Sequence, residues 1–214
     1  MKNFKKSFSS PLLFYPWTRG SKRIFSMHMK KSFGLFVLPQ LLFLFAFADQ
    51  PVCFTWIDQP GKYTDLMFGQ RPLVRYVYER MDPKDRERTY KPFHHVYQSD
   101  GQGFLTKGPG GKFTHHRGIY FGFSKCSFTD KEGKEHKIDT WHCKRAYQTH
   151  EKIIRSHSDL KSAGQSVEIA WRLDDGTIFA KEERPLTSSL RPDDSLQIDF
   201  GSVLSTEHDT LVLD

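Results

Sequence analysis

The sequence predicts an all-β fold, an antiparallel β-sandwich, from three observations. Short segments rich in β-branched and aromatic residues recur along the chain, turn-forming residues separate them, and no long segment has helical spacing. Strands that follow one another without crossover helices pair antiparallel and close into a sandwich or a barrel. The expected strands are residues 73–79, 93–97, 118–123, 151–160, 167–173, 177–183 and 196–200.

The strand at 167–173 has the clearest alternation. Its odd positions carry large apolar side chains, and its even positions carry Glu168, Ala170 and Arg172. A period of two is typical of a half-buried strand. An Asp-Asp-Gly sequence at 174–176 follows, and Asp-Gly between two alternating segments predicts a β-hairpin because glycine tolerates a positive φ angle.

Other segments give weaker or different signals. Residues 151–160 fit both a helix and a strand, and the adjacent Ile153 and Ile154 favour a strand. Residues 107–112 (KGPGGK) predict a loop, and residues 130–137 predict a charged, solvated turn. Alternation continues from 196 to the last residue without a closing turn, so we expect the domain at 49–214 to be truncated at its C-terminus.

The first 48 residues have the pattern of an export signal. Residues 33–48 form an apolar run that follows Lys30 and Lys31 and ends in Ala-Phe-Ala. The run is shorter than the roughly 20 apolar residues of a membrane-spanning helix. We therefore expect a signal peptide at 1–48 that is cleaved after Ala48, and a secreted or periplasmic protein. The alternative is an uncleaved signal anchor.

We expect translation to start later than Met1, because 32 residues precede the apolar run. Initiation at Met27 or Met29 would give a compact leader, so residues 1–26 are expected to be a start-site artefact.

Charge is distributed unevenly. The chain has 32 Lys and Arg against 25 Asp and Glu, but residues 1–48 contain eight of the bases and no acid, which leaves 24 bases and 25 acids in 49–214. A nucleic-acid-binding surface is therefore not expected in this domain, nor is a membrane contact after cleavage.

Three cysteines follow the leader: Cys53, Cys126 and Cys143. An oxidising compartment allows one disulfide among them, and buried free thiols are the alternative.

Histidine is concentrated in four short motifs. These are KPFHH at 91–95, HHRG at 115–118, DTWHC at 139–143 and HE at 150–151. Together with GPGGxFxHHRGIYFGF, these motifs resemble the PmoA-like family of secreted bacterial proteins, over residues 73–214. The resemblance implies a sandwich related to the galactose-mutarotase superfold, and therefore a carbohydrate ligand. It does not imply a subunit of a membrane methane monooxygenase.

Strand geometry limits how these histidines can meet. Neighbouring side chains on a strand point to opposite faces, so if these pairs lie on strands, only one histidine of His94–His95 and one of His115–His116 can reach a common site. If 115–123 is a strand, its apolar side chains Ile119, Phe121 and Phe123 mark the core face, and His116 and Tyr120 lie on the other.

We expect one site that binds or processes carbohydrate. Histidine acids and a carboxylate base suit proton transfer at a sugar ring, and aromatic side chains suit stacking on it. The predicted catalytic residues are His116, His142 and Glu151. The predicted substrate-binding residues are His94, His95, His115, Arg117, Tyr120, Asp139 and Trp141.

Two alternatives remain open. One is a non-catalytic binding or structural module, and the other is a metal site made of histidines and Glu151. No H-x-H or H-E-x-x-H spacing occurs, so no metal ligand is assigned and the cofactor is unknown. The sequence does not indicate the oligomeric state.

Overall fold

The computed structural model describes residues 10–14 and 51–214, and the chain divides into two compact units, Met1–Pro16 with Val52–Asp214 and Trp17–Pro51. All described residues except Pro51 belong to the first unit. Most of the expected leader and its cleavage site after Ala48 lie outside the described residues. In the described part of the chain, no helix is long and apolar enough to cross a membrane.

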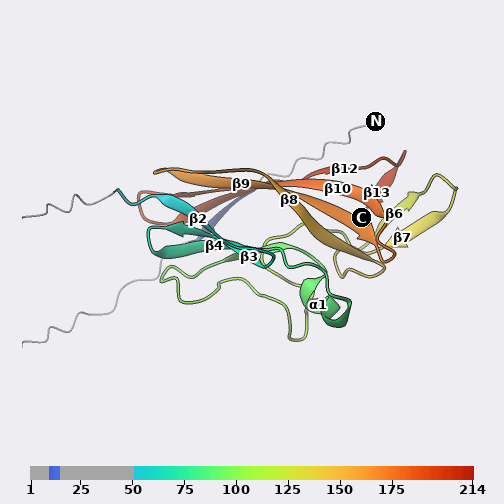
Figure 1. Ribbon diagram of the computed structural model, residues 1–214, viewed down its shortest axis with the longest axis horizontal. Helices are drawn as coiled ribbons and strands as arrows, with labels where there is room; N and C mark the ends of the chain where they lie inside the picture. The colour runs from blue at the N-terminus through green and yellow to red at the C-terminus, as the bar shows by residue number, and fades with distance from the viewer. Residues whose placement is uncertain (1–9, 15–50) are drawn as a thin grey trace, which may run out of the picture. The chain divides into compact units, whose positions relative to one another are not determined.

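The fold is all-β, and every strand pairing among the described residues is antiparallel (Figure 1). The largest sheet has the strand order β1-β11-β10-β9-β8, with β12 paired to β10. Its strands are β1 (Ser10–Phe14), β8 (Ala146–Ser158), β9 (Ser162–Leu173), β10 (Ile178–Leu190), β11 (Leu196–Phe200) and β12 (Val203–Ser205).

Two smaller sheets complete the fold. One has the order β2-β3-β4-β5 and the other β13-β6-β7. Their strands are β2 (Phe54–Gln59), β3 (Tyr63–Phe68), β4 (Arg71–Val77), β5 (Phe93–Val96), β6 (Cys126–Thr129), β7 (Glu135–Ile138) and β13 (Leu211–Leu213). A 3₁₀ turn, Pro83–Asp85, and a single helical turn, α1 (Arg86–Thr89), lie between β4 and β5.

Two of the three apolar clusters among the described residues each join the large sheet to one of the smaller sheets. Leu66 and Val74 of the four-stranded sheet pack with Leu186 and Ile198 of the large sheet. At the other end, Phe128 of β6 belongs to the same cluster as residues of β9 and β10, among them Val167, Ile169, Trp171 and Phe179. The long strands β9 and β10 therefore act as one layer of a sandwich that is covered by two separate sheets (Figure 1).

The strand predictions at 73–79, 93–97, 151–160, 167–173, 177–183 and 196–200 are confirmed in outline by β4, β5, β8, β9, β10 and β11. The predicted hairpin is also present. Gly176 has a φ of 91°, and its amide donates to the carbonyl of Leu173 at 2.9 Å. The apolar face of β9 is buried as expected, from Val167 to Leu173.

The predicted strand at 118–123 is wrong. Only Ile119 of that segment forms a bridge, to His94 of β5, and the segment belongs to a long irregular connection between β5 and β6. The alternation of apolar and polar residues nevertheless persists, since Ile119, Phe121 and Phe123 pack against the core.

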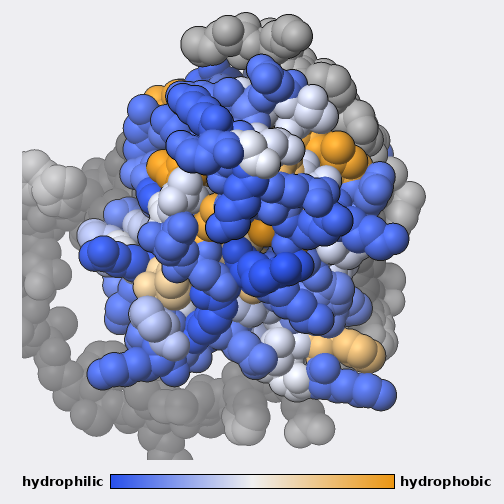
Figure 2. Space-filling view, turned by 90° about the vertical axis from the view of Figure 1, so that its right-hand side faces the viewer, coloured by the Kyte–Doolittle hydropathy of each residue, from blue (hydrophilic) through white to orange (hydrophobic). Residues whose placement is uncertain are grey.

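The surface at the end that carries β6 and β7 is mainly hydrophilic, with small and separate apolar patches (Figure 2).

Candidate functional site

The DTWHC motif forms the turn between β7 and β8. The backbone groups of Asp139 and Lys144 pair with each other at 3.2 and 2.9 Å, which closes the turn. Cys143, inside it, adopts a φ of 56°. The carbonyl of Phe123 accepts the amides of Thr140 and Trp141, each at 2.9 Å, so the turn is fixed to the end of the irregular connection.

Asp139 also orients His142. Its Oδ1 accepts the backbone amide of His142 at 2.7 Å, and its Oδ2 lies 2.7 Å from His142 Nδ1. A carboxylate only accepts hydrogen bonds, so Nδ1 carries the proton and Nε2 presents its lone pair. The side chain of His142 is 35% exposed, which leaves that nitrogen accessible.

The HHRG motif brings two more imidazoles to His142. The ring centroid of His115 lies 4.3 Å from that of His142 and 4.3 Å from that of His116. His116 in turn stacks on Phe113 at 5.2 Å. The limit of one histidine from this pair, which was expected only if the pair lay on a strand, does not apply. The pair lies in a turn, where the amide of His116 donates to the carbonyl of Phe113, so strand alternation does not apply.

Aromatic side chains extend this group. The rings of Tyr120 and Trp141 lie 5.0 Å apart, and Trp141 lies 6.1 Å from His116. Phe113 is 46% exposed. The hydroxyl of Tyr120 is buried without a hydrogen-bond partner among the described residues, and burial raises its pKa. We call the whole group the histidine–aromatic cluster: Phe113, His115, His116, Tyr120, Asp139, Trp141 and His142.

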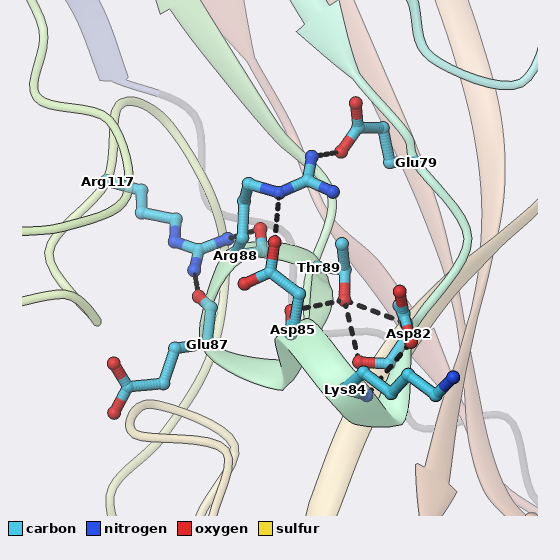
Figure 3. Close-up of polar contacts among 8 residues, drawn as sticks. All are labelled: Glu79, Asp82, Lys84, Asp85, Glu87, Arg88, Thr89 and Arg117. Atoms are coloured by element: carbon cyan, nitrogen blue, oxygen red, sulfur yellow. Dashed lines mark hydrogen bonds and ion pairs between the residues drawn. The ribbon is translucent and has the colours of Figure 1, made fainter.

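Arg117 fixes the segment that carries these histidines. Its guanidinium donates to the carbonyls of Glu87 and Arg88 in α1, the latter at 2.9 Å (Figure 3). It also donates to the carbonyl of Thr114 at 3.2 Å. It also lies 4.4 Å from the ring centroid of Tyr90. Arg117 is only 4% exposed, so it acts as an anchor beneath the surface, and this geometry does not support its predicted role in binding substrate.

Lys91 was not predicted as a site residue, although it opens the KPFHH motif. It is 2% exposed, its ammonium donates to the carbonyl of Trp141, and its Nζ lies 4.0 Å from the ring centroid of Tyr120. Burial lowers its pKa to about 8. No local pattern distinguishes this lysine from a solvated one, because its role depends on a turn 50 residues away.

His94 and His95 lie outside the cluster. They point to opposite sides of β5, as expected: His94 stacks on Tyr76 at 4.6 Å, and His95 stacks on Phe104 at 4.0 Å. His94 is 2% exposed, and burial, together with the charge of Arg184, lowers its pKa to about 3. His95 is 6% exposed, and burial lowers its pKa to about 4, so both imidazoles remain neutral and serve in packing.

Glu151 also lies apart from the cluster, on an exposed part of β8. Its Oε1 accepts from Thr149 at 2.6 Å and from Arg172 at 2.9 Å, and these bonds lower its pKa. A carboxylate committed to an arginine is a poor general base, so the geometry does not support the predicted catalytic role.

The structure has no disulfide among Cys53, Cys126 and Cys143, all of which are free, so it fits the alternative of free thiols. Burial raises the pKa of Cys143 to about 11, which disfavours a thiolate. The metal alternative also gains no support. Within residues 10–14 and 51–214, no group of three histidine, cysteine or acidic side chains is arranged to hold a metal ion.

Fold and site together define an all-β sandwich protein with a histidine–aromatic cluster supported by loops. The chain belongs to a family of unknown function, DUF6807, whose profile matches residues 63–214 and therefore includes the whole cluster. Comparisons with curated proteins and with solved structures found no match.

Proposed function

We propose that this is an exported β-sandwich protein that binds carbohydrate at the histidine–aromatic cluster. Export is supported by the pattern of residues 1–48, and the carbohydrate ligand by the resemblance of the motifs to PmoA-like proteins. The observation that carries the proposal is the gathering of Trp141, Tyr120 and Phe113 around three imidazoles and one carboxylate. Aromatic faces suit the C–H face of a sugar ring, and imidazole and carboxylate groups hydrogen-bond to its hydroxyls.

The central test is binding by the Trp141→Ala variant. We expect a glycan array to identify a ligand for the wild type, and the variant to bind it at least tenfold more weakly, a loss of roughly 1.4 kcal/mol or more, because the stacking face is removed. Isothermal titration calorimetry measures the change.

Trp56→Ala is the matched control, because Trp56 packs against the β2–β5 side of the core and donates to the carbonyl of His157. That variant should keep its affinity once folding is verified by circular dichroism. Absence of any glycan ligand for the wild type, or equal losses in the two variants, would refute the proposal.

A catalytic form of this function is favoured by the Asp139–His142 pair. A histidine whose Nδ1–H is held by a carboxylate presents Nε2 as a base, and acid–base catalysis at a sugar ring needs such a group. His115, 4.3 Å away, is the adjacent imidazole that could return the proton.

His142→Gln separates an enzyme from a binding module. For an enzyme, we expect turnover of the bound sugar to fall by roughly 10²-fold or more, with binding within a few-fold of the wild type. His136→Gln is the control, since His136 pairs with Asp130 in the β6–β7 hairpin. If the wild type binds a sugar without converting it, the protein is a non-catalytic module.

A further inference from the structure

Two buried cations beside the cluster have no anionic partner among the described residues. Arg117 donates to the backbone carbonyls of Glu87, Arg88 and Thr114 and contacts the Tyr90 side chain, and Lys91 donates to the carbonyl of Trp141. In the described part of the chain, neither forms an ion pair. The buried Arg184, by contrast, is paired with Glu182 at 2.7 Å. Burying a charge without a counter-ion is costly, so this arrangement calls for a function.

The groups around these cations neutralise them only in part. The Tyr120 ring lies beneath Lys91 Nζ, and the Tyr90 ring lies beneath Arg117, so both cations have cation–π contacts. These rings carry no net charge. Burial chiefly lowers the pKa of Lys91, and the positive charge of Arg117 lowers it further, while Cys143 and Asp139 act in the opposite direction. At about 8, this pKa keeps Lys91 mostly protonated at neutral pH.

The imidazole of His115 lies within this positive field. Burial chiefly lowers its pKa, and the neighbouring His142, His116 and Lys91 lower it further, in that order, against the opposing effect of Asp139. Asp139 is the one carboxylate in the cluster, and both of its oxygens are already bonded to His142. The buried Lys91 and Arg117 beside the cluster therefore carry positive charge that no free carboxylate of the cluster balances.

We propose that the cluster selects an anionic saccharide, one whose sugar rings carry carboxylate or sulfate groups. This inference rests on the proposed carbohydrate function and specifies the class of substrate. The acid group supplies the negative charge that the cluster lacks, near His115, His116 and the buried Lys91, while Trp141 and Phe113 contact the ring. An anion beside His115 favours the imidazolium form, so binding takes up protons and strengthens as the pH falls toward 6.

The test uses matched pairs of acidic and neutral oligosaccharides. Oligogalacturonate is compared with β-galactan fragments, oligomannuronate with mannan fragments, and sulfated galactan with unsulfated galactan, all by isothermal titration calorimetry on the secreted chain. We expect at least one acidic member to bind tenfold or more tightly than its neutral counterpart, and the carboxylate and sulfate pairs reveal which acid group is preferred. Titrations in two buffers of different ionisation enthalpy measure the proton uptake.

Lys91→Met should abolish the preference for the acidic member, because it keeps the length of the side chain and removes the charge. Lys152→Met makes the same change on an exposed strand, at a lysine that is 63% exposed and lies 3.7 Å from Glu168, and should leave the preference intact. If Lys91→Met does not fold, His115→Gln is the variant to use, because His115 lies in a half-buried turn. His115→Gln should reduce both the preference for acidic saccharides and the proton uptake on binding.

The outcomes separate the two proposals. Neutral fragments that bind as tightly as their acidic partners overturn the anionic class and leave carbohydrate binding intact. A preference for acidic sugars that survives in both Lys91→Met and His115→Gln also overturns the role of this cluster in selecting them. Failure of every saccharide to bind overturns the proposed function itself.

Discussion

Replacing Glu182 with alanine is expected to lower the free energy of unfolding by about 3–5 kcal/mol. Glu182 and Arg184 are both fully buried, and the carboxylate accepts from Arg184 at 2.7 and 2.9 Å, from Trp171 Nε1 at 2.9 Å and from Ser202 Oγ at 3.0 Å. Alanine at this position would leave a guanidinium in the core without its counter-ion. The loss should exceed that of any exposed ion pair.

Urea denaturation followed by circular dichroism measures this change. Glu135→Ala is the control, because Glu135 and Lys137 are 58% and 69% exposed, and their pair should contribute at most about 1 kcal/mol. The double variant Glu182→Met/Arg184→Met should recover much of the loss, since it removes both charges. If Glu182→Ala lowered the free energy of unfolding by less than Glu135→Ala does, the stabilising role of the buried Glu182–Arg184 pair would be contradicted.

This ion pair also supports the candidate site. Arg184 Nη1 donates to the carbonyl of Pro92 at 3.1 Å, and Pro92 directly follows Lys91. The buried pair thus holds the segment that places Lys91 beneath Trp141. The hydrogen bond from Arg184 to the carbonyl of Pro92 therefore connects the buried ion pair of the core to the segment that carries Lys91.

Much of the fold could be predicted from the sequence, because its regular strands obey a period of two. The strand β9 was predicted from its alternation, because one face of the strand is buried and carries apolar residues. The turn after it was predicted from Asp-Gly, because glycine allows the positive φ that the turn requires. The first two strands of the four-stranded sheet were not predicted. β2 exposes most of its residues, including Ile57, and the burial pattern that makes a strand recognisable is therefore weak.

The site was predicted only in part, for a related reason. The rule that adjacent side chains diverge holds for His94 and His95 on β5 and fails for His115 and His116 in a turn. Residues of the DTWHC motif were predicted to belong to the site. The way in which Asp139 closes the turn and orients His142 was not predicted, because it depends on hydrogen bonds that the sequence does not specify. The burial of Lys91 depends on tertiary packing alone.

Gly118→Ala is expected to detach the histidine-bearing segment from β5. A Cβ atom at this position would lie 1.9 Å from the carbonyl oxygen of His94, far inside van der Waals contact, and that oxygen is backbone and cannot rotate away. The bridge at this point consists of two bonds, His94 N to Ile119 O at 2.9 Å and Ile119 N to His94 O at 2.8 Å. Moving the segment breaks both, at a combined cost of roughly 3 kcal/mol or more.

Hydrogen–deuterium exchange at the amides of His94 and Ile119 is the direct measurement, and both should exchange much faster in the variant. Because the same segment positions His115 and His116, ligand binding should weaken together with the loss of protection. Gly103→Ala is the control: its Cβ would lie 3.2 Å from the end of the Gln98 side chain, which can rotate away. Unchanged protection in Gly118→Ala would mean that the segment is not held against β5 by this bridge, and the cluster would then need another support.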